Sequence, residues 1–241
     1  MREVGRGPVL GVDAAGGHGW VGVVVDPAGF GGAHVAPTVA ALVALVEGRL
    51  GERLACVGVD IPIGAIDGPR RQADVAARAF VGVRRSSVFW TPHRAALECA
   101  DQASANRHLG AIGMPKVSAQ GWNLVARIRE VAALAATDER VVEVFPEASF
   151  RAMAGRDLLH AKRSAAGALD RLALLAATEP SLVLPSDPAA LGPAGAVALD
   201  DLFDAAAAGW SAWRVVRGEA LALGADDEVD PVTGRRIAVW V

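Results

Sequence analysis

The sequence predicts an α/β protein whose strands end in carboxylates. Val-rich apolar runs bounded by glycine occur at residues 9–26 and 55–64, as in buried strands. Residues 37–50, between these runs, have apolar side chains at helical spacing. Asp13 and Asp60 end two of the strands, and ligands of open α/β sheets bind at this carboxyl edge. We therefore expect both carboxylates at one edge of a sheet.

The first two strands are joined by a turn that is rich in glycine. The glycines within residues 16–19 allow a tight reversal and let a ligand approach the backbone closely. A third strand, at residues 30–35, follows this pair. By residue type alone, Asp13 is either a hydrogen-bonded turn residue or a metal ligand, and both interpretations stay open at this point.

The middle of the chain is mostly helical in this interpretation. Amphipathic patterns, proline positions and N-cap residues predict helices at residues 69–80, 95–110, 118–136 and 165–177. Residues 140–147 predict a further strand, which Pro146 interrupts. Glu143 and Glu147 fall on the same side of it if the chain stays extended.

The last part of the chain contains a proline-rich loop, a helix and a closing strand, at residues 179–196, from 197 onward and at 229–241. Acidic residues in the first turns of that helix are favoured by the helix dipole, so a capped helix is one interpretation. Asp204, however, lies beyond the cap and precedes four consecutive alanines. Such a run can pack closely on the sheet and direct Asp204 to the strand edge.

Length and composition favour a single domain over residues 1–241. About half of the residues are apolar, which is enough to fill a substantial core. The sequence shows no apolar run of membrane-spanning length and no signal-peptide pattern at its start. Cys56 and Cys99 belong to no metal-binding motif. We expect a cytoplasmic protein without a zinc site or a membrane anchor.

The basic residues are unevenly distributed. Residues 83–94 combine arginines, serines and aromatic side chains, a mixture that suits a phosphate backbone beside a stacked ring, although an ordinary surface loop is an alternative. Lysine and arginine together number 24, yet only Lys116 and Lys162 are lysines. Because a compact ammonium acts as a point charge on phosphate, these two residues are candidates for substrate contacts.

The acidic residues at the ends of separate elements form the main candidate site. Asp13, Asp60 and Asp204 would converge there with Glu143 or Glu147. A ligand set made only of carboxylates favours Mg²⁺ or Mn²⁺. Two such ions can activate a water and stabilise the leaving oxygen in phosphodiester cleavage.

Six motifs, four of which contain these acids, resemble the family called domain of unknown function 429, which is predicted to be an RNase H-like nuclease. The motifs are Gly11-Val12-Asp13, Gly58-Val59-Asp60-Ile61-Pro62-Ile63-Gly64, Arg84-Arg85-Ser86-Ser87-Val88-Phe89, Glu143-Val144-Phe145-Pro146-Glu147, Lys162 with Gly167 and Arg171, and Asp204-Ala205. The resemblance extends from about residue 9 to residue 241. It implies a ribonuclease H-like mixed sheet, with its first three strands antiparallel, flanked by helices. Residues 84–136, approximately, would form a loop and helical insertion.

The resemblance also implies roles for individual residues. The implied metal ligands are Asp13, Asp60, Asp204 and either Glu143 or Glu147, with Glu147 favoured because Pro146 places it at the strand end. The predicted catalytic residues are Asp13, Asp60, Glu147, Asp204 and Lys162. The predicted substrate-binding residues are Arg84, Arg85, Ser86, Lys116 and Arg171.

The leading functional prediction is a nuclease that depends on Mg²⁺ or Mn²⁺ and acts on nucleic acid or another phosphate-containing substrate. One alternative is a small-molecule phosphotransferase of the actin-like kinase superfamily, which shares the hairpin, its carboxylate and the glycine turn. Residues 60–64 match poorly the second phosphate loop that such a kinase needs. The other alternative is a non-catalytic binding module with an RNase H-like fold.

Overall fold

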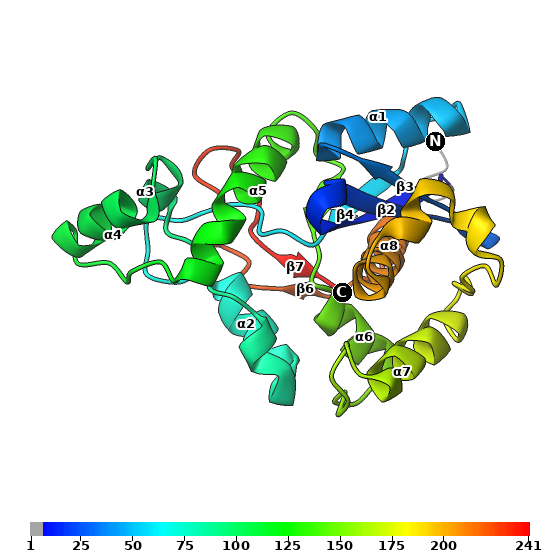
Figure 1. Ribbon diagram of the computed structural model, residues 1–241. Coiled ribbons are helices and arrows are strands. Elements are labelled where there is room, and N and C mark those ends of the chain that lie inside the picture. Colours follow the sequence, from blue (N-terminus) through cyan, green and yellow to red (C-terminus); the bar gives the residue numbers. More distant parts are fainter. Residues whose placement is uncertain (1–6) are drawn as a thin grey trace.

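Five strands form one mixed sheet in the computed structural model, which describes residues 7–241 (Figure 1). In chain order the strands are β1 (Val9–Ala14), β2 (Trp20–Asp26), β3 (Gly29–Ala36), β4 (Cys56–Val59) and β5 (Val141–Glu143). Their order across the sheet is β3-β2-β1-β4-β5. The pairs β1–β2 and β2–β3 are antiparallel, whereas β1–β4 and β4–β5 are parallel. The predicted mixed sheet with three antiparallel strands is confirmed.

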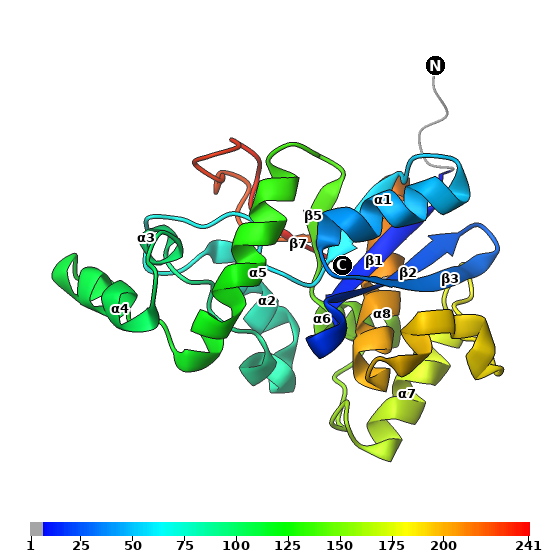
Figure 2. The same ribbon diagram turned by 45° about the horizontal axis from the view of Figure 1, so that its top comes forward.

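Helices cover both faces of this sheet (Figure 2). One face is covered by α1 (Val39–Leu50) and α5 (Ala119–Ala135), and the opposite face by α8 (Leu199–Arg217). Strand alternation divides the apolar side chains of β1 between the two cores. Leu10 and Val12 pack with α1 and α5, and Val9 packs with α8.

The two helices on the first face, α1 and α5, begin at polar residues that the sequence provides as caps. The hydroxyl of Thr38 accepts a hydrogen bond from the first turn of α1, and that of Ser118 does the same for α5. Gly51 ends α1 in the left-handed conformation, where glycine pays no steric penalty. The predicted helices at 37–50 and 118–136 are therefore present, and their ends differ from the prediction by at most two residues.

The close approach of α8 to the sheet follows from residues without large side chains. A Cβ atom on Gly11 of β1 would lie 1.9 Å from the backbone N of Gly209 and 2.1 Å from the carbonyl O of Ala205. A Cβ atom on Gly58 of β4 would lie 2.8 Å from the carbonyl O of Ala208. Helix and strands therefore touch through backbone atoms. The alanine run packs closely on the sheet, as the sequence predicts.

The segment between β4 and β5 contains five helices, including α5. They are α2 (Gln72–Phe80), η2 (Gly82–Ser87), α3 (Arg94–Leu97), α4 (Gln102–Ala111) and α5. In both views α3 and α4 lie away from the sheet (Figures 1 and 2). The single helix expected at 95–110 is wrong, because the chain breaks before Asp101. That residue forms a capping box with Ser104 and starts α4 as a new helix.

After β5 the chain continues with α6 (Pro146–Ala154), α7 (Ala165–Ala176), η3 (Pro188–Ala196), β6 (Ala222–Leu223) and β7 (Val239–Trp240). The remaining element, η1 (Gly16–His18), lies in the turn between β1 and β2. The predicted strand at 140–147 is shorter, because Pro146 starts a helix. Over residues 7–241, no helix has both the length and the hydrophobicity needed to span a membrane.

Candidate functional site

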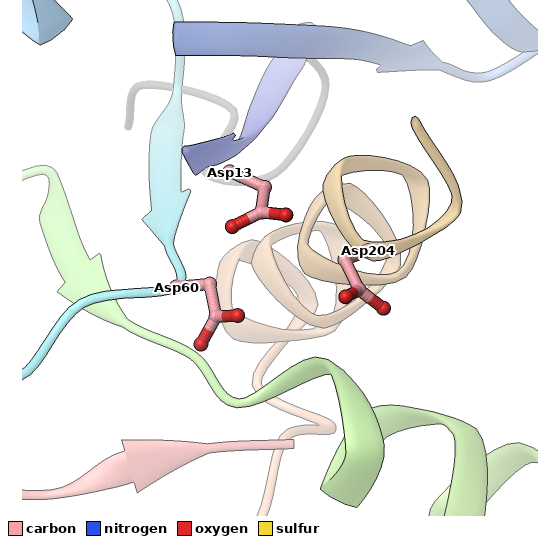
Figure 3. A group of neighbouring side chains, drawn as sticks. All are labelled: Asp13, Asp60 and Asp204. Atoms are coloured by element: carbon pink, nitrogen blue, oxygen red, sulfur yellow. The ribbon is translucent and has the colours of Figure 1, made fainter. Parts of the chain in front are cut away.

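Three aspartates from separate elements face one another at the carboxyl ends of β1 and β4 (Figure 3). Asp13 belongs to β1, Asp60 directly follows β4, and Asp204 lies on α8. Each offers one carboxylate oxygen, and these three oxygens lie within 4.8 Å of one another. Asp13 and Asp204 are buried, and Asp60 is half-buried. The structure thus brings together three of the five predicted metal ligands.

The register of the sheet explains why Asp13 and Asp60 meet. Gly11 pairs with Gly58 across β1 and β4, and the N–H of Asp60 donates to the carbonyl of Val12 at 2.9 Å. Each aspartate lies two residues after its glycine, so side-chain alternation turns both carboxylates to the face that α8 covers. Because the glycines let α8 approach the strands, Asp204 reaches the same edge.

The environment of the three carboxylates disfavours their charged forms. Burial, followed by repulsion from Asp60 and Asp204, raises the pKa of Asp13 well above its usual range. Burial and Asp204 act in the same direction on the pKa of Asp60. Burial raises the pKa of Asp204 to about 6, although Lys162 opposes this shift. Within residues 7–241, the Asp13 carboxylate accepts one hydrogen bond, from the N–H of Ala14 at 2.7 Å, and the Asp60 carboxylate accepts none.

Lys162 is the cation closest to this cluster in the part of the chain that the structure describes. Its Nζ donates to Oδ2 of Asp204 and lies 4.0 Å from Oδ2 of Asp200. Burial is the largest single effect and disfavours the ammonium, but the charge and hydrogen bond of Asp204, together with the charges of Asp60 and Asp13, outweigh it and raise the pKa of Lys162. Lys162 is therefore positively charged at neutral pH and offsets part of the negative charge of the cluster.

The start of α7 fixes the turn that carries Lys162. The hydroxyl of Ser164 donates to the carbonyl of Ala161 at 2.8 Å and accepts from the N–H of Gly167 at 3.0 Å. A Cβ atom on Gly167 would lie only 2.0 Å from the carbonyl O of Ala161. Glycine at this position therefore lets the turn lie against the helix, which holds Lys162 in place.

Glu143 lies outside the group of three aspartates. It pairs with Val59 in the β4–β5 register, one residue before Asp60, so its side chain leaves the strand on the opposite side from that of Asp60, although it lines the same cavity. Its oxygens accept two hydrogen bonds from Arg71, at 2.7 and 2.8 Å, and one from the N–H of Ile63 at 2.7 Å. Burial raises the pKa of Glu143, and Arg71 opposes that shift. The carboxylate is thus held by an arginine and by the backbone that follows Asp60.

Glu147 lies in the first turn of α6, because Pro146 ends the extended chain before it. Nη2 of Arg171 donates to Oε2 of Glu147 at 2.7 Å, and Nε of Arg84 lies 3.6 Å from Oε1. Arg84 also donates to two backbone carbonyls of residues 158–159. Glu147 lines the same cavity as the aspartates but is not one of the three clustered acids. Two arginines therefore surround the residue that was favoured as the fourth ligand.

A cavity of about 410 Å³ opens beside the three aspartates. Apart from charged residues its lining is mostly apolar and includes Val88, Phe89 and Phe145. Phe89 is 44% exposed, so an aromatic ring is available to a ligand at the surface. The cavity thus combines a cluster of negative charge with apolar walls.

The remaining predicted substrate contacts lie outside this cavity. Arg85 and Ser86 are exposed on η2, directly before three residues that line the cavity. Lys116 is exposed in the connection between α4 and α5 and does not line the cavity. The basic segment is therefore divided between side chains that build the wall and side chains that face solvent.

Arg71 is not among the site residues predicted from the sequence, and its side chain is only 2% exposed. Its guanidinium donates to Glu143 and Asp74, and Nη1 also donates to the carbonyl of Ile63 at 3.1 Å. These bonds fix the chain three residues after Asp60. The spacing of Arg71 and Asp74 could have indicated an ion pair, since oppositely charged residues three positions apart at a helix start can contact each other.

The sequence matches the profile of the family described as "Protein of unknown function (DUF429)" over residues 11–229. The chain belongs to this family. The matched range contains the three clustered aspartates and Lys162. No curated protein and no solved structure matches the chain. The family assignment thus covers the whole candidate site without attaching an activity to it.

Proposed function

We propose that this protein is a metal-dependent phosphodiesterase that cleaves nucleic acid on a ribonuclease H-like fold. The observation that carries the proposal is the cluster of Asp13, Asp60 and Asp204 at the end of a mixed five-stranded sheet. A mixed sheet in the order β3-β2-β1-β4-β5, with a long helix across β1, supports the fold assignment.

The three aspartates fit a hard divalent cation. Oxygen-only ligand sets favour Mg²⁺ and Mn²⁺ over softer metals. Asp13 is 7% exposed, and its burial raises the pKa of its carboxyl. Within residues 7–241, only a backbone N–H donates a hydrogen bond to this carboxylate. Buried charges without a partner are costly, so a cation between these carboxylates would relieve an unfavourable arrangement.

Each part of the site has a role in this proposal. A bound divalent ion supplies charge that activates water and stabilises the leaving oxygen. Asp13, Asp60 and Asp204 hold it at the strand edge. Lys162, beside Asp204, neutralises charge on the scissile phosphate. The apolar wall at Phe89 limits water around the reacting group and offers a ring on which a base can stack.

The size of the cavity and the exposed cations support a flexible substrate. A volume of about 410 Å³ is typical of pockets that take small ligands, which favours one nucleotide of a single strand over a duplex. Arg85 and Ser86 lie exposed next to the cavity wall and are placed to contact the adjoining phosphates. Arg171 is instead buried against Glu147, so its role is to support the wall.

The test is cleavage of a panel of labelled single-stranded and double-stranded RNA and DNA, with Mn²⁺ or Mg²⁺ and with chelator. We expect cleavage only with the metal, and loss of at least a hundredfold in the Asp13→Asn variant, because removal of a core catalytic group costs several kcal/mol in the barrier. Asp226→Asn, at a side chain that is 93% exposed, is the matched control and should keep full activity.

Two other results would contradict the proposal. Folded protein that binds Mn²⁺ but leaves every substrate intact would favour a binding module. Thermal stabilisation by ATP with Mg²⁺, together with transfer of its phosphate to a small acceptor, would favour the phosphotransferase.

A further inference from the structure

We propose that the site holds one divalent cation and that the ammonium of Lys162 takes the place of the second. This inference rests on the proposed function and refines it. A two-ion site needs enough carboxylates to bind both ions, whereas the described part of this chain offers three clustered aspartates and one lysine. The lysine is bonded to Asp204, a member of that cluster.

The acids that would complete a second metal site are already paired. Glu143 accepts two hydrogen bonds from Arg71, which is nearly fully buried. Glu147 is bonded to Arg171, whose side chain is 1% exposed. Withdrawing one partner of a buried ion pair leaves the other charge buried and unpaired, which is strongly unfavourable, so neither glutamate is free to bind an ion.

Charge balance leads to the same stoichiometry. The three aspartates carry three negative charges when ionised. One divalent ion and one ammonium neutralise them completely. Two divalent ions with the ammonium still present would leave a net positive charge in a largely buried cluster, which is costly at short range.

The turn that carries Lys162 is fixed by contacts with two helices. Ser164 and Gly167 fix its turn against α7. On the other side, Nε of Arg163 donates to Oδ2 of Asp200 at 2.9 Å, which ties the same turn to α8. Because the turn is attached to both helices, the backbone of Lys162 stays beside α8, where its ammonium reaches Asp204.

The stoichiometry can be measured without any assay of activity. The full chain is stripped with chelator and titrated with Mn²⁺, and bound ions are counted by calorimetry and by electron paramagnetic resonance. Two Mn²⁺ ions about 3.5–4 Å apart give an exchange-coupled spectrum, whereas a single ion does not. We expect one uncoupled Mn²⁺ per chain in the wild type.

Removing the lysine charge should open the second position. Lys162→Met keeps the length of the side chain and should bind two Mn²⁺ per chain with a coupled spectrum. Lys162→Gln is a second neutral variant, and Lys162→Arg, which keeps the charge, should bind one ion. Lys116→Met is the matched control, because Lys116 is an exposed lysine that does not line the cavity, and this variant should also bind one ion.

The outcomes separate this inference from the function on which it rests. Two coupled ions in the wild type would overturn the role of Lys162 and leave the phosphodiesterase proposal standing. One ion in both the wild type and the folded neutral variants would also overturn it. No bound Mn²⁺ in the wild type would contradict the proposed function itself.

Discussion

Replacing Asp13 by asparagine should stabilise the metal-free protein near neutral pH. The substitution keeps the shape of the side chain and an oxygen for the N–H of Ala14, but it removes one of three clustered negative charges. Two charges 4.8 Å apart repel by about 3.5 kcal/mol at an effective dielectric constant of about 20, and by about 1 kcal/mol in bulk water. Because the cluster borders an open cavity, we expect a gain of about 1–3 kcal/mol in the free energy of unfolding.

The gain should depend on pH in a defined direction. The folded-state pKa values of all three aspartates are raised, to about 6 for Asp204. The folded protein therefore binds protons more tightly than the unfolded chain. Stability from these groups is fully present below the unfolded pKa of about 3.9 and is lost as pH rises through the folded values. Wild type and Asp13→Asn should be similar near pH 4 and should diverge by about pH 7.

Bound Mn²⁺ should reverse the order of stability, so that wild type becomes more stable than Asp13→Asn. At a free Mn²⁺ concentration about a hundred times the dissociation constant, wild type gains about 2.7 kcal/mol, whereas the variant loses a ligand and gains less. Urea unfolding, followed by tryptophan fluorescence, measures the stability of both proteins with Mn²⁺ and with chelator. Asp226→Asn, which removes a mostly exposed carboxylate, controls for the change in net charge. If Asp13→Asn lowers stability in chelator near neutral pH, Asp13 is a structural turn residue and the reasoning fails.

Three further substitutions test the scaffold by urea unfolding. Gly11→Ala places a methyl group against the backbone of α8 and should cost more than about 3 kcal/mol, while Gly48→Ala, where a Cβ meets nothing, should be neutral or stabilising. Arg71→Met leaves two buried carboxylates unpaired and should cost about 3–5 kcal/mol. Arg94→Met removes a surface pair and should cost about 1 kcal/mol or less, and equal losses in these two variants would refute the burial argument. Ser164→Ala removes the cap of α7 and should cost about 1 kcal/mol; no loss would show that the cap is dispensable.

The sheet and the convergence of three acids were predictable from local pattern. Strand runs that end at Asp13 and Asp60 are signals carried within a few residues. The alanine run after Asp204 indicated close packing, and the glycines at 11 and 209 show how close it is. These patterns depend on strand alternation and on residue size, and both can be read from a short stretch of sequence.

The surroundings of the two glutamates were not predictable in the same way. Whether a carboxylate binds a metal or an arginine depends on residues that are distant along the chain. Arg71 is 72 residues from Glu143, and Arg171 is 24 residues from Glu147. The turn into α6 at Pro146 also moved Glu147 from a strand to a helix, and a proline fits either a strand end or a helix start.

The contact between α8 and the strands has a consequence for motion. Side-chain interfaces adjust by changing rotamers, but a contact made by glycine and alanine backbone has none to change. The backbone of Asp204 is therefore held at a fixed distance from that of Asp13. Any closure around a substrate must come from a part that α8 does not restrain, namely η2 and the exposed Phe89 that follows it. The aspartates and the turn that carries Lys162 form the immobile side of the site, and the aromatic wall forms its adjustable side.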